Sequence, residues 1–309
     1  MIVVFGSINL DLVTRVDRFP APGETITGRS FATYPGGKGA NQALAAARAG
    51  ARVQMFGAVG DDRFADAALA LLRDGRVDLG GVQRVAAPTG CATILVASNG
   101  ENCIAVVPGA NAHASPDTLP DSALSRDSLL LLQQEVPIIA NAALIARARR
   151  LGARIVFNAA PAHPLSLDLL QQLDVLIVNE DEAAMLAAAL GWPAASFAFA
   201  SAAVAATANA LTVIVTLGER GAVAACGTET IQCVPPHVDV VDTTAAGDAF
   251  VGALAAALDG GSQLRDALRT ATAAGSLACT VSGAQPAMPH HDAIAALLPS
   301  VTARTIPRC

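Results

Sequence analysis

Short apolar runs alternate with helical patterns along most of the chain. The runs typical of buried parallel strands cover residues 2–5, 53–58, 128–132, 155–158, 175–178 and 211–216. Segments with a helical pattern lie between them, at residues 39–48, 63–73, 137–150 and 181–190. This alternation predicts an α/β fold with right-handed crossovers. In such a fold, ligands bind beyond the carboxyl ends of the strands.

Two segments interrupt this alternation, at about residues 12–34 and 91–109. They contain strand-like pieces without helices between them, among them residues 25–28 and 31–34. Ser98-Asn99-Gly100-Glu101 is a good hairpin turn between residues 91–97 and 102–107. We expect a small antiparallel sheet that closes over a substrate as a lid, or else an edge extension of the main sheet. Residues 302–309 are expected to form a loose tail.

Composition excludes several classes of protein. Of the 309 residues, 53% are hydrophobic and 15% charged, and the net charge is −6 with no basic block, which argues against a nucleic-acid partner. The six cysteines form no C-x-x-C pair, and the N-terminus lacks a basic region, so a cytoplasmic protein with reduced thiols is expected. Residues 183–218 carry no charge, but Gly191-Trp192-Pro193 divides them, so we expect helix, turn, helix and strand rather than a membrane span.

The most informative motif is Asp242-Thr243-Thr244-Ala245-Ala246-Gly247-Asp248, which runs into an Ala-rich helical segment. A helix that starts with small residues leaves backbone N–H groups free to hold an anion. A carboxylate in the first turn can accept a proton beside that anion, and phosphoryl transfer to an alcohol needs both features. The motif is also compatible with an ordinary helix cap.

A second motif, Gly36-Gly37-Lys38-Gly39-Ala40-Asn41, permits positive φ angles and a close approach of the backbone to a ligand. It is neither a Walker A loop nor a dinucleotide fingerprint. Asn9 and Asp11, just past the first strand, would share one face of an extended segment and suit a polyhydroxylated ligand, although turn formation is an alternative.

Two further segments follow buried strands. Asn179-Glu180-Asp181-Glu182 can form a capping box, and its carboxylates can help to hold Mg²⁺ through water. Thr216-Leu217-Gly218-Glu219-Arg220-Gly221 suits a turn beneath a nucleotide, or a plain hairpin turn.

In combination, these motifs resemble the ribokinase-like (PfkB) carbohydrate kinase family from Gly6-Ser7-Ile8-Asn9 to Gly283-Ala284-Gln285-Pro286. The resemblance implies one domain, residues 1–309, with a three-layer α/β/α fold, a mostly parallel sheet and a small β lid that pairs two subunits. It implies an ATP-dependent kinase that phosphorylates the hydroxymethyl group of a pentose, and D-ribose is the expected pentose. A kinase for another sugar or a nucleoside, or a silent sugar- or nucleotide-binding regulator, is an alternative.

The resemblance also implies site roles. Asp248 is the expected base, and the expected anion hole is Ala245, Ala246 and Gly247. The expected sugar contacts are Asn9, Asp11, Gly37, Lys38, Gly39, Asn41, Glu135 and Asp248. The expected nucleotide contacts are Asn179, Thr216, Gly218, Gly221, Ala246, Gly247 and Thr272, and Glu182 organises Mg²⁺.

A monovalent cation, K⁺, is implied beside the anion hole. Its expected ligands are Asp242, Thr244, Ala278, Val281 and Gly283. Two positions depart from the pattern of the family. Ala287 stands where a serine is common, so a hydroxyl ligand is missing. Thr272 stands where a larger residue contacts adenine.

Overall fold

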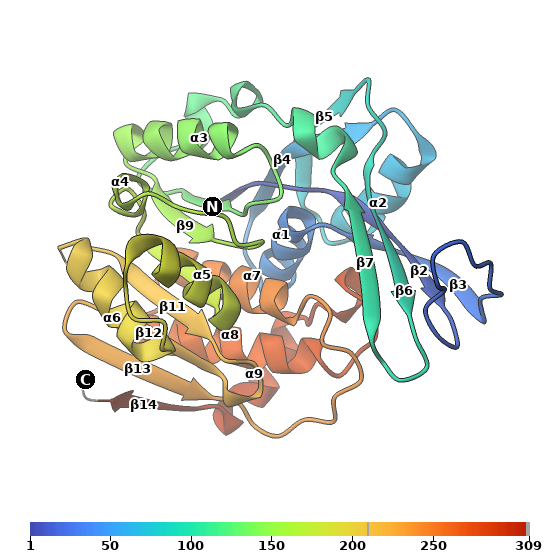
Figure 1. Ribbon diagram of the computed structural model, residues 1–309. Coiled ribbons are helices and arrows are strands. Elements are labelled where there is room, and N and C mark those ends of the chain that lie inside the picture. The colour runs from blue at the N-terminus through green and yellow to red at the C-terminus, as the bar shows by residue number, and fades with distance from the viewer. Residues whose placement is uncertain (209, 307–309) are drawn as a thin grey trace.

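A ten-stranded sheet forms the middle of the protein in the computed structural model, which describes residues 1–208 and 210–306 (Figure 1). The strand order is β14-β13-β12-β11-β10-β9-β8-β1-β4-β5. All pairings from β5 to β11 are parallel, and β12, β13 and β14 continue the sheet antiparallel. The strands are β1 (Ile2–Phe5), β4 (Val53–Gly60), β5 (Asp78–Val85), β8 (Leu129–Leu132), β9 (Arg154–Asn158), β10 (Val175–Asn179), β11 (Thr212–Thr216), β12 (Ala222–Cys226), β13 (Glu229–Val234) and β14 (Thr302–Ile306).

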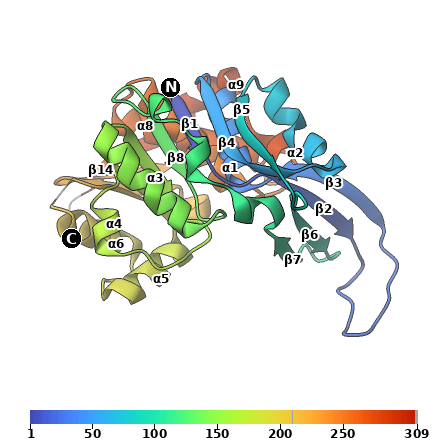
Figure 2. The same ribbon diagram turned by 90° about the horizontal axis from the view of Figure 1, so that it is seen from above.

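Helices cover both faces of this sheet, so the main body has three layers (Figures 1 and 2). One face packs against α1 (Lys38–Arg48), α2 (Arg63–Asp74), α7 (Ala246–Asp259) and α8 (Leu264–Ala278), with α9 (His291–Leu297) beside α8. The other face packs against α3 (Ile138–Leu151), α4 (Leu167–Leu170), α5 (Glu180–Leu190) and α6 (Ser196–Ala206). In β1 the buried side chains alternate between the two cores, because successive residues of a strand point to opposite faces. The predicted α/β fold is confirmed.

A second, four-stranded sheet projects from one side of the main body (Figures 1 and 2). Its order is β3 (Ser30–Gly36), β2 (Asn9–Arg15), β6 (Gly90–Val96) and β7 (Asn102–Val107). Two expectations are wrong here. The pairing of β2 with β6 is parallel, so the sheet is not purely antiparallel, and residues 25–28 lie in a loop rather than in a strand. The hairpin of β6 and β7 around Asn99-Gly100 is confirmed.

The expectation of a loose C-terminal tail is wrong for residues 302–306. They form β14, which pairs antiparallel with β13 at the edge of the main sheet, where Ala303 packs against the core. Residues 307–309 lie outside the described part of the chain. Residues 183–218 include most of α5, all of α6 and β11, and no described helix is long and apolar enough to cross a membrane.

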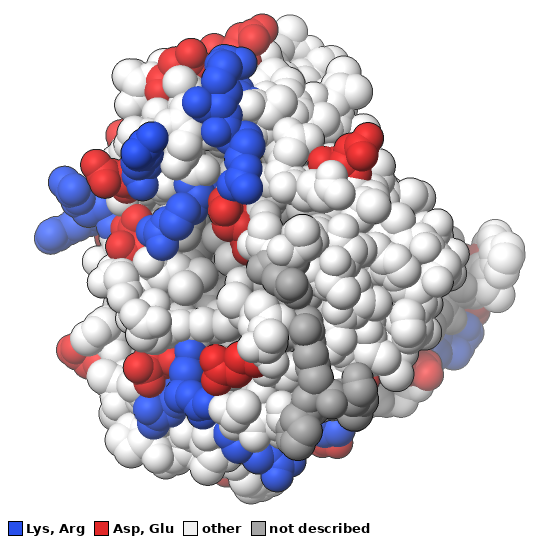
Figure 3. Space-filling model, turned by 90° about the vertical axis from the view of Figure 1, so that its left-hand side faces the viewer, with Lys and Arg blue, Asp and Glu red and all other residues white. Residues whose placement is uncertain are grey.

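Opposite charges lie close together on the face of the protein shown in Figure 3. On α3, at the left of Figure 1, Arg149 forms an ion pair of 2.9 Å with Asp174, and Arg147 lies 3.2 Å from Asp121. These pairs neutralise the arginines locally.

Candidate active site

The start of α7 is an open helix N-terminus. Ala245 precedes it with a φ angle of 58°, in the left-handed region that strains a residue with a side chain. The N–H groups of Ala245, Gly247 and Asp248 donate to no acceptor within the described residues, and a Cβ added to Gly247 would meet no atom within 4 Å. Free N–H groups facing open space at the positive end of a helix form a suitable site for an anion.

Asp248 is buried in this first turn, and both of its carboxylate oxygens accept hydrogen bonds from α1. Asn41 Nδ2 donates to Oδ2 over 2.9 Å, and Gln42 Nε2 donates to Oδ1 over 2.9 Å. The two helices approach closely because residue 252 of α7 is glycine, where a Cβ would lie 2.5 Å from that of Ala45. The two glycine-containing motifs of the sequence therefore meet at one carboxylate.

Asp11, on β2, is close enough to Asp248 for the two charges to interact. Its carboxylate lies over Gly36 of β3, where a Cβ would lie 2.4 Å from Oδ2. Burial, together with the nearby Glu135 and Asp248 carboxylates, raises the pKa of Asp11 to about 7. Burial opposes the charge of Lys38, but Asp248, Glu135 and Glu182 raise the pKa of its ammonium group above the usual value. Asp11, Lys38, Glu135 and Asp248 thus form one electrostatic cluster.

Ser7 and Asn111 hold two of the expected sugar contacts, Glu135 and Asn9, in place. Ser7 Oγ and the Lys38 N–H both donate to Glu135 Oε2, over 2.6 and 3.0 Å. Asn111, which is buried, donates through Nδ2 to Asn9 Oδ1 over 2.7 Å. Asn111, Gln42 and the role of Ser7 were not predicted from the sequence. Ser7 lies two residues before Asn9 and Gln42 directly follows Asn41, so proximity to the motifs was the only signal for these two.

The glycines of residues 36–39 have a structural purpose that was not predicted. Gly37 has a φ angle of 88°, and a Cβ on Gly39 would lie 2.6 Å from the backbone of Gly6 and Ser7. We expected the backbone of this segment to approach a ligand closely. At Gly39 the backbone instead approaches the turn that follows β1. Asn41 Oδ1 is buried without a hydrogen-bond donor among the residues the structure describes, so it can accept a hydrogen bond from a ligand.

The expected nucleotide contacts follow β10 and β11. Asn179 and Glu182 form the predicted capping box, with two bonds of 2.8 Å, at the start of α5. Burial raises the pKa of Glu182, and the charges of Lys38 and Asp248 also act on this carboxyl group. Gly221 is needed by the turn itself, because its φ angle is 86° and a Cβ would lie 2.0 Å from the Cys233 carbonyl oxygen.

The remaining nucleotide candidates are less constrained. A Cβ on Gly218 would meet no atom of the described residues within 4 Å, and Thr216 Oγ1 donates weakly to the Val178 carbonyl over 3.4 Å. Thr272 is buried on α8 with its hydroxyl unpartnered, one turn before Gly275, where a Cβ would lie 3.3 Å from the Ala246 carbonyl. The structure thus brings α8 beside the start of α7.

The expected cation ligands come together on two adjoining loops. Asp242 joins them, since its Oδ1 accepts from the N–H and hydroxyl of Thr244 and its Oδ2 accepts from the Gly283 N–H over 2.9 Å. Its pKa is lowered, because these hydrogen bonds outweigh the effect of burial. The carbonyl oxygens of Thr244, Val281 and Gly283 accept no hydrogen bond within the described residues, whereas that of Ala278 accepts a long one of 3.4 Å from Val281. These unpartnered carbonyls suit a monovalent cation.

The described residues contain no group of three or more His, Cys, Asp or Glu side chains that could hold a metal ion. Glu182 nevertheless fits the way Mg²⁺ binds beside phosphates, through one carboxylate and several waters. Its Oε2 caps α5, and its Oε1 accepts no hydrogen bond within the described residues.

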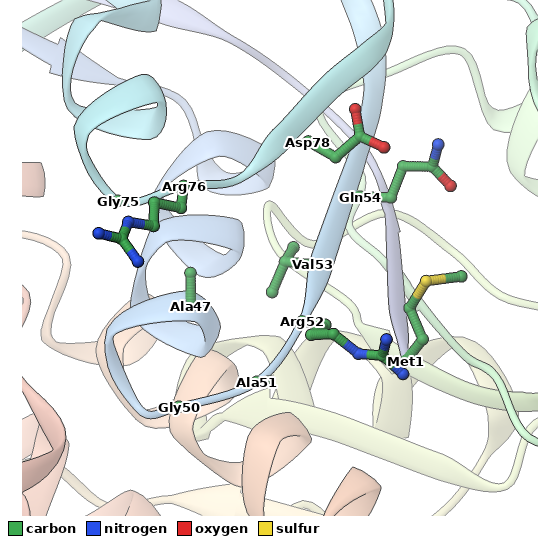
Figure 4. A pocket seen from close by; sticks show the side chains of 10 residues that line it. All are labelled: Met1, Ala47, Gly50, Ala51, Arg52, Val53, Gln54, Gly75, Arg76 and Asp78. Carbon is green, nitrogen blue, oxygen red and sulfur yellow. The ribbon is translucent and has the colours of Figure 1, made fainter.

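Two other hollows in the described part of the chain are lined by none of these candidate residues. One, of about 450 Å³, lies at the opposite edge of the sheet, lined by Met1, Arg52, Asp78 and the ends of α1 and α2 (Figure 4). Another, of about 370 Å³, lies at the start of α3 and is lined by Gln134, Asn141 and His163.

Comparison with known proteins identifies the class. The model of the pfkB family of carbohydrate kinases matches residues 1–291, and the chain therefore belongs to this family. Ribokinase from Bacillus subtilis is 36% identical over 299 residues, 96% of this chain and 99% of that protein. The crystal structure of ribokinase from Thermotoga maritima has a TM-score of 0.89 at 33% identity, covering 96% of this chain and 99% of that one. The structure of Arabidopsis thaliana ribokinase complexed with ribose and ATP has a TM-score of 0.87 at 36% identity, covering 96% and 98%.

Proposed function

We propose that this carbohydrate kinase transfers the γ-phosphoryl group of ATP to the hydroxymethyl group of D-ribose, giving ribose 5-phosphate. The observation that carries the proposal is a buried carboxylate, Asp248, in the first turn of an open helix N-terminus and in contact with Asn41. The relatives named ribokinase support ribose as the sugar. Asp11, Lys38 and Glu135, whose charges act on one another or on Asp248, supply polar groups that suit a polyol.

In the proposed mechanism Asp248 accepts the proton of the attacking hydroxyl group. The N–H groups at the start of α7, from Ala245 to Gly247, hold the phosphoryl oxygens as charge shifts during transfer, and little covalent chemistry is required of the protein. Asn9, Asp11, Asn41 and Glu135 bind the sugar hydroxyls together with the glycine-rich segment 37–39. Asn179, Thr216, Gly218, Gly221 and Thr272 surround the nucleotide.

Two cations accompany this proposal. Mg²⁺, when bound to ATP, neutralises phosphate charge, and Glu182 would hold it through water. K⁺ would bind the free carbonyls of Thr244, Val281 and Gly283, with Asp242 keeping the two loops together. Ala287, which is buried and offers no hydroxyl, leaves this site one side-chain ligand short of the family pattern.

The small sheet suits a lid and a dimer contact. Each residue of β7 is exposed, and Ile104, Val106 and Val107 are all more than half exposed, at 51%, 54% and 55%. A second copy that covers this strand would bury them, so we include a homodimer, built from one 309-residue domain per subunit, in the proposal. The five described cysteines are free thiols, which agrees with a cytoplasmic protein.

Steady-state phosphate transfer to ribose, deoxyribose, fructose, adenosine and pseudouridine tests the function. We expect the highest kcat/KM on ribose, with lower activity when tetramethylammonium replaces K⁺. A higher kcat/KM on a nucleoside or another sugar would replace ribose in the proposal. Binding without any product would favour a regulatory protein. Light scattering of the same preparation tests the dimer, which a monomeric mass would exclude.

Asp11 gives the sugar step a defined pH dependence. With its pKa at about 7, Asp11 is largely protonated in acid and then accepts hydrogen bonds from sugar hydroxyls poorly. The kcat/KM for ribose should therefore rise as the pH rises through 7, with a limiting slope of about tenfold per pH unit on the acid side. In Asp11→Asn, kcat/KM for ribose should be low at every pH, and it should not show this rise through pH 7. An unchanged acid limb in that variant would assign the titration to another group.

A further inference from the structure

A chain of buried amides is linked by hydrogen bonds to Asp248. It comprises Gln42 of α1, Asn158 of β9 and Gln133, which follows β8. Gln42 and Gln133 have no exposed surface, and Asn158 is 7% exposed. Neither the proposed sugar contacts nor the nucleotide contacts include these three side chains.

The backbone dictates how each amide is oriented. Asn158 lies 3.1 Å from the Ile177 carbonyl oxygen, which can only accept, so the atom facing it must be Nδ2. Asn158 Oδ1 then faces Gln42 over 2.9 Å, so the Gln42 atom there must be the donor Nε2. Gln42 Oε1 consequently accepts from Gln133 Nε2 over 2.8 Å.

This orientation determines what Asp248 receives. Gln42 Nε2 has two hydrogens; one goes to Asn158 Oδ1, and the other goes to Asp248 Oδ1 over 2.9 Å. Because Gln42 is fully buried, Oδ1 faces the interior. Oδ2 faces Asn41, whose own Oδ1 is unpartnered and which belongs to the proposed sugar site.

We propose that Gln42 is a positioning residue: it anchors Asp248 through Oδ1, with its amide oriented by Asn158 and Gln133. Oδ2, which also accepts from Asn41, is thereby held so that its second lone pair can accept the sugar proton. The inference rests on the proposed function. A loosened carboxylate would still let both substrates bind, but the base would be misplaced at the moment of transfer. The effect should therefore fall on kcat rather than on KM.

Gln42→Met, which is similar in size but has no N–H group, tests the role. Since a misplacement of about 1 Å can cost on the order of a hundredfold, we expect kcat to fall by roughly 10- to 100-fold, with KM for ribose and ATP unchanged within roughly threefold. Asn158→Leu leaves the contact of Gln42 with Asp248 but removes its orientation, so a smaller fall in kcat is expected. The kcat of the double variant should lie within about twofold of that of Gln42→Met, since both substitutions act through the one contact between Gln42 and Asp248.

Gln134→Met is the matched control, because Gln134 is a neighbouring buried amide whose Oε1 and Nε2 have no partner among the described residues. It should keep the kcat of the wild type. Circular dichroism and thermal melting establish that each variant is folded.

Gln42→Glu tests the role through the pH dependence of kcat, which a purely structural role of Gln42 would not change. This variant also serves as the test if Gln42→Met does not fold. The introduced carboxyl group could donate to Asp248 when it is protonated, whereas its ionised form would repel Asp248. The kcat of Gln42→Glu relative to the wild type should therefore recover as the pH is lowered from about 8 to about 6.

Three results would overturn the positioning role: a kcat of Gln42→Met equal to that of Gln134→Met, losses that multiply in the double variant, or no recovery of Gln42→Glu in acid. A wild-type protein that phosphorylates no sugar overturns the proposed function and this role together. An active wild type with an unaffected Gln42→Met overturns the role alone.

Discussion

Asp248→Asn is expected to lower kcat by about 10²- to 10⁴-fold, the usual contribution of a positioned base, while KM for ribose changes little. The asparagine is similar in size, and its Oδ1 can still accept the hydrogen bond from Gln42. Asn41 can turn its unpartnered Oδ1 toward the new amide, so the fold should be retained. Steady-state kinetics, together with direct ribose binding by calorimetry, separate loss of chemistry from loss of binding.

Asp266→Asn is a suitable control for this variant. Asp266 lies in the first turn of the neighbouring helix, α8, but its side chain is 63% exposed, and among the described residues it pairs only with Arg269. It should keep the activity of the wild type. Turnover by Asp248→Asn within twofold of the wild type would mean that Asp248 is not the base.

Gly247→Val is expected to give the second large effect. A side chain at this position would enter the open space before the free N–H groups of α7, where the transferred phosphoryl group is proposed to lie. Displacement of the reacting groups by about 1 Å can cost roughly a hundredfold, so kcat/KM for ATP should fall by at least that factor. No packing contact opposes the substitution, so the melting temperature should not fall appreciably.

Two further glycine variants serve as comparisons for Gly247→Val. Gly247→Ala should give a smaller loss of kcat/KM with equal or higher stability, because alanine favours helix over glycine by about 1 kcal/mol. Gly260→Ala, beyond the other end of α7, meets only ordinary contacts with the Ala256 and Ala257 carbonyls and should behave as the wild type. Normal ATP kinetics in Gly247→Val would place the phosphate elsewhere.

The main sheet could be predicted because its strands are buried on both faces and therefore appear as uninterrupted apolar runs. The run at residues 175–178 predicts β10 to within one residue. In contrast, β14 has the sequence Thr-Ala-Arg-Thr-Ile, whose few apolar positions become a strand only because β13, distant in the sequence, offers a free edge. The parallel pairing of β2 with β6 is equally non-local, since alternation of side chains does not reveal strand direction.

The candidate site divides in the same way. Asp248 and Asn41 could be predicted from their motifs, and the hydrogen bond between them confirms that the two motifs meet. Gln42 could not be predicted, because a single amide in an Ala-rich helix is compatible with a solvent-exposed side chain. Only the close packing of α1 on α7 at Gly252 buries it against Asp248.

A crystal structure with ribose and a non-hydrolysable ATP analogue tests the central claim most directly. We predict that the sugar lies between Asp11 and Asn41, with its hydroxymethyl oxygen about 2.7 Å from Asp248 Oδ2. The terminal phosphate should contact the N–H of Gly247 on the opposite side of that oxygen. A sugar bound out of reach of Asp248, or a terminal phosphate away from the start of α7, would contradict the account.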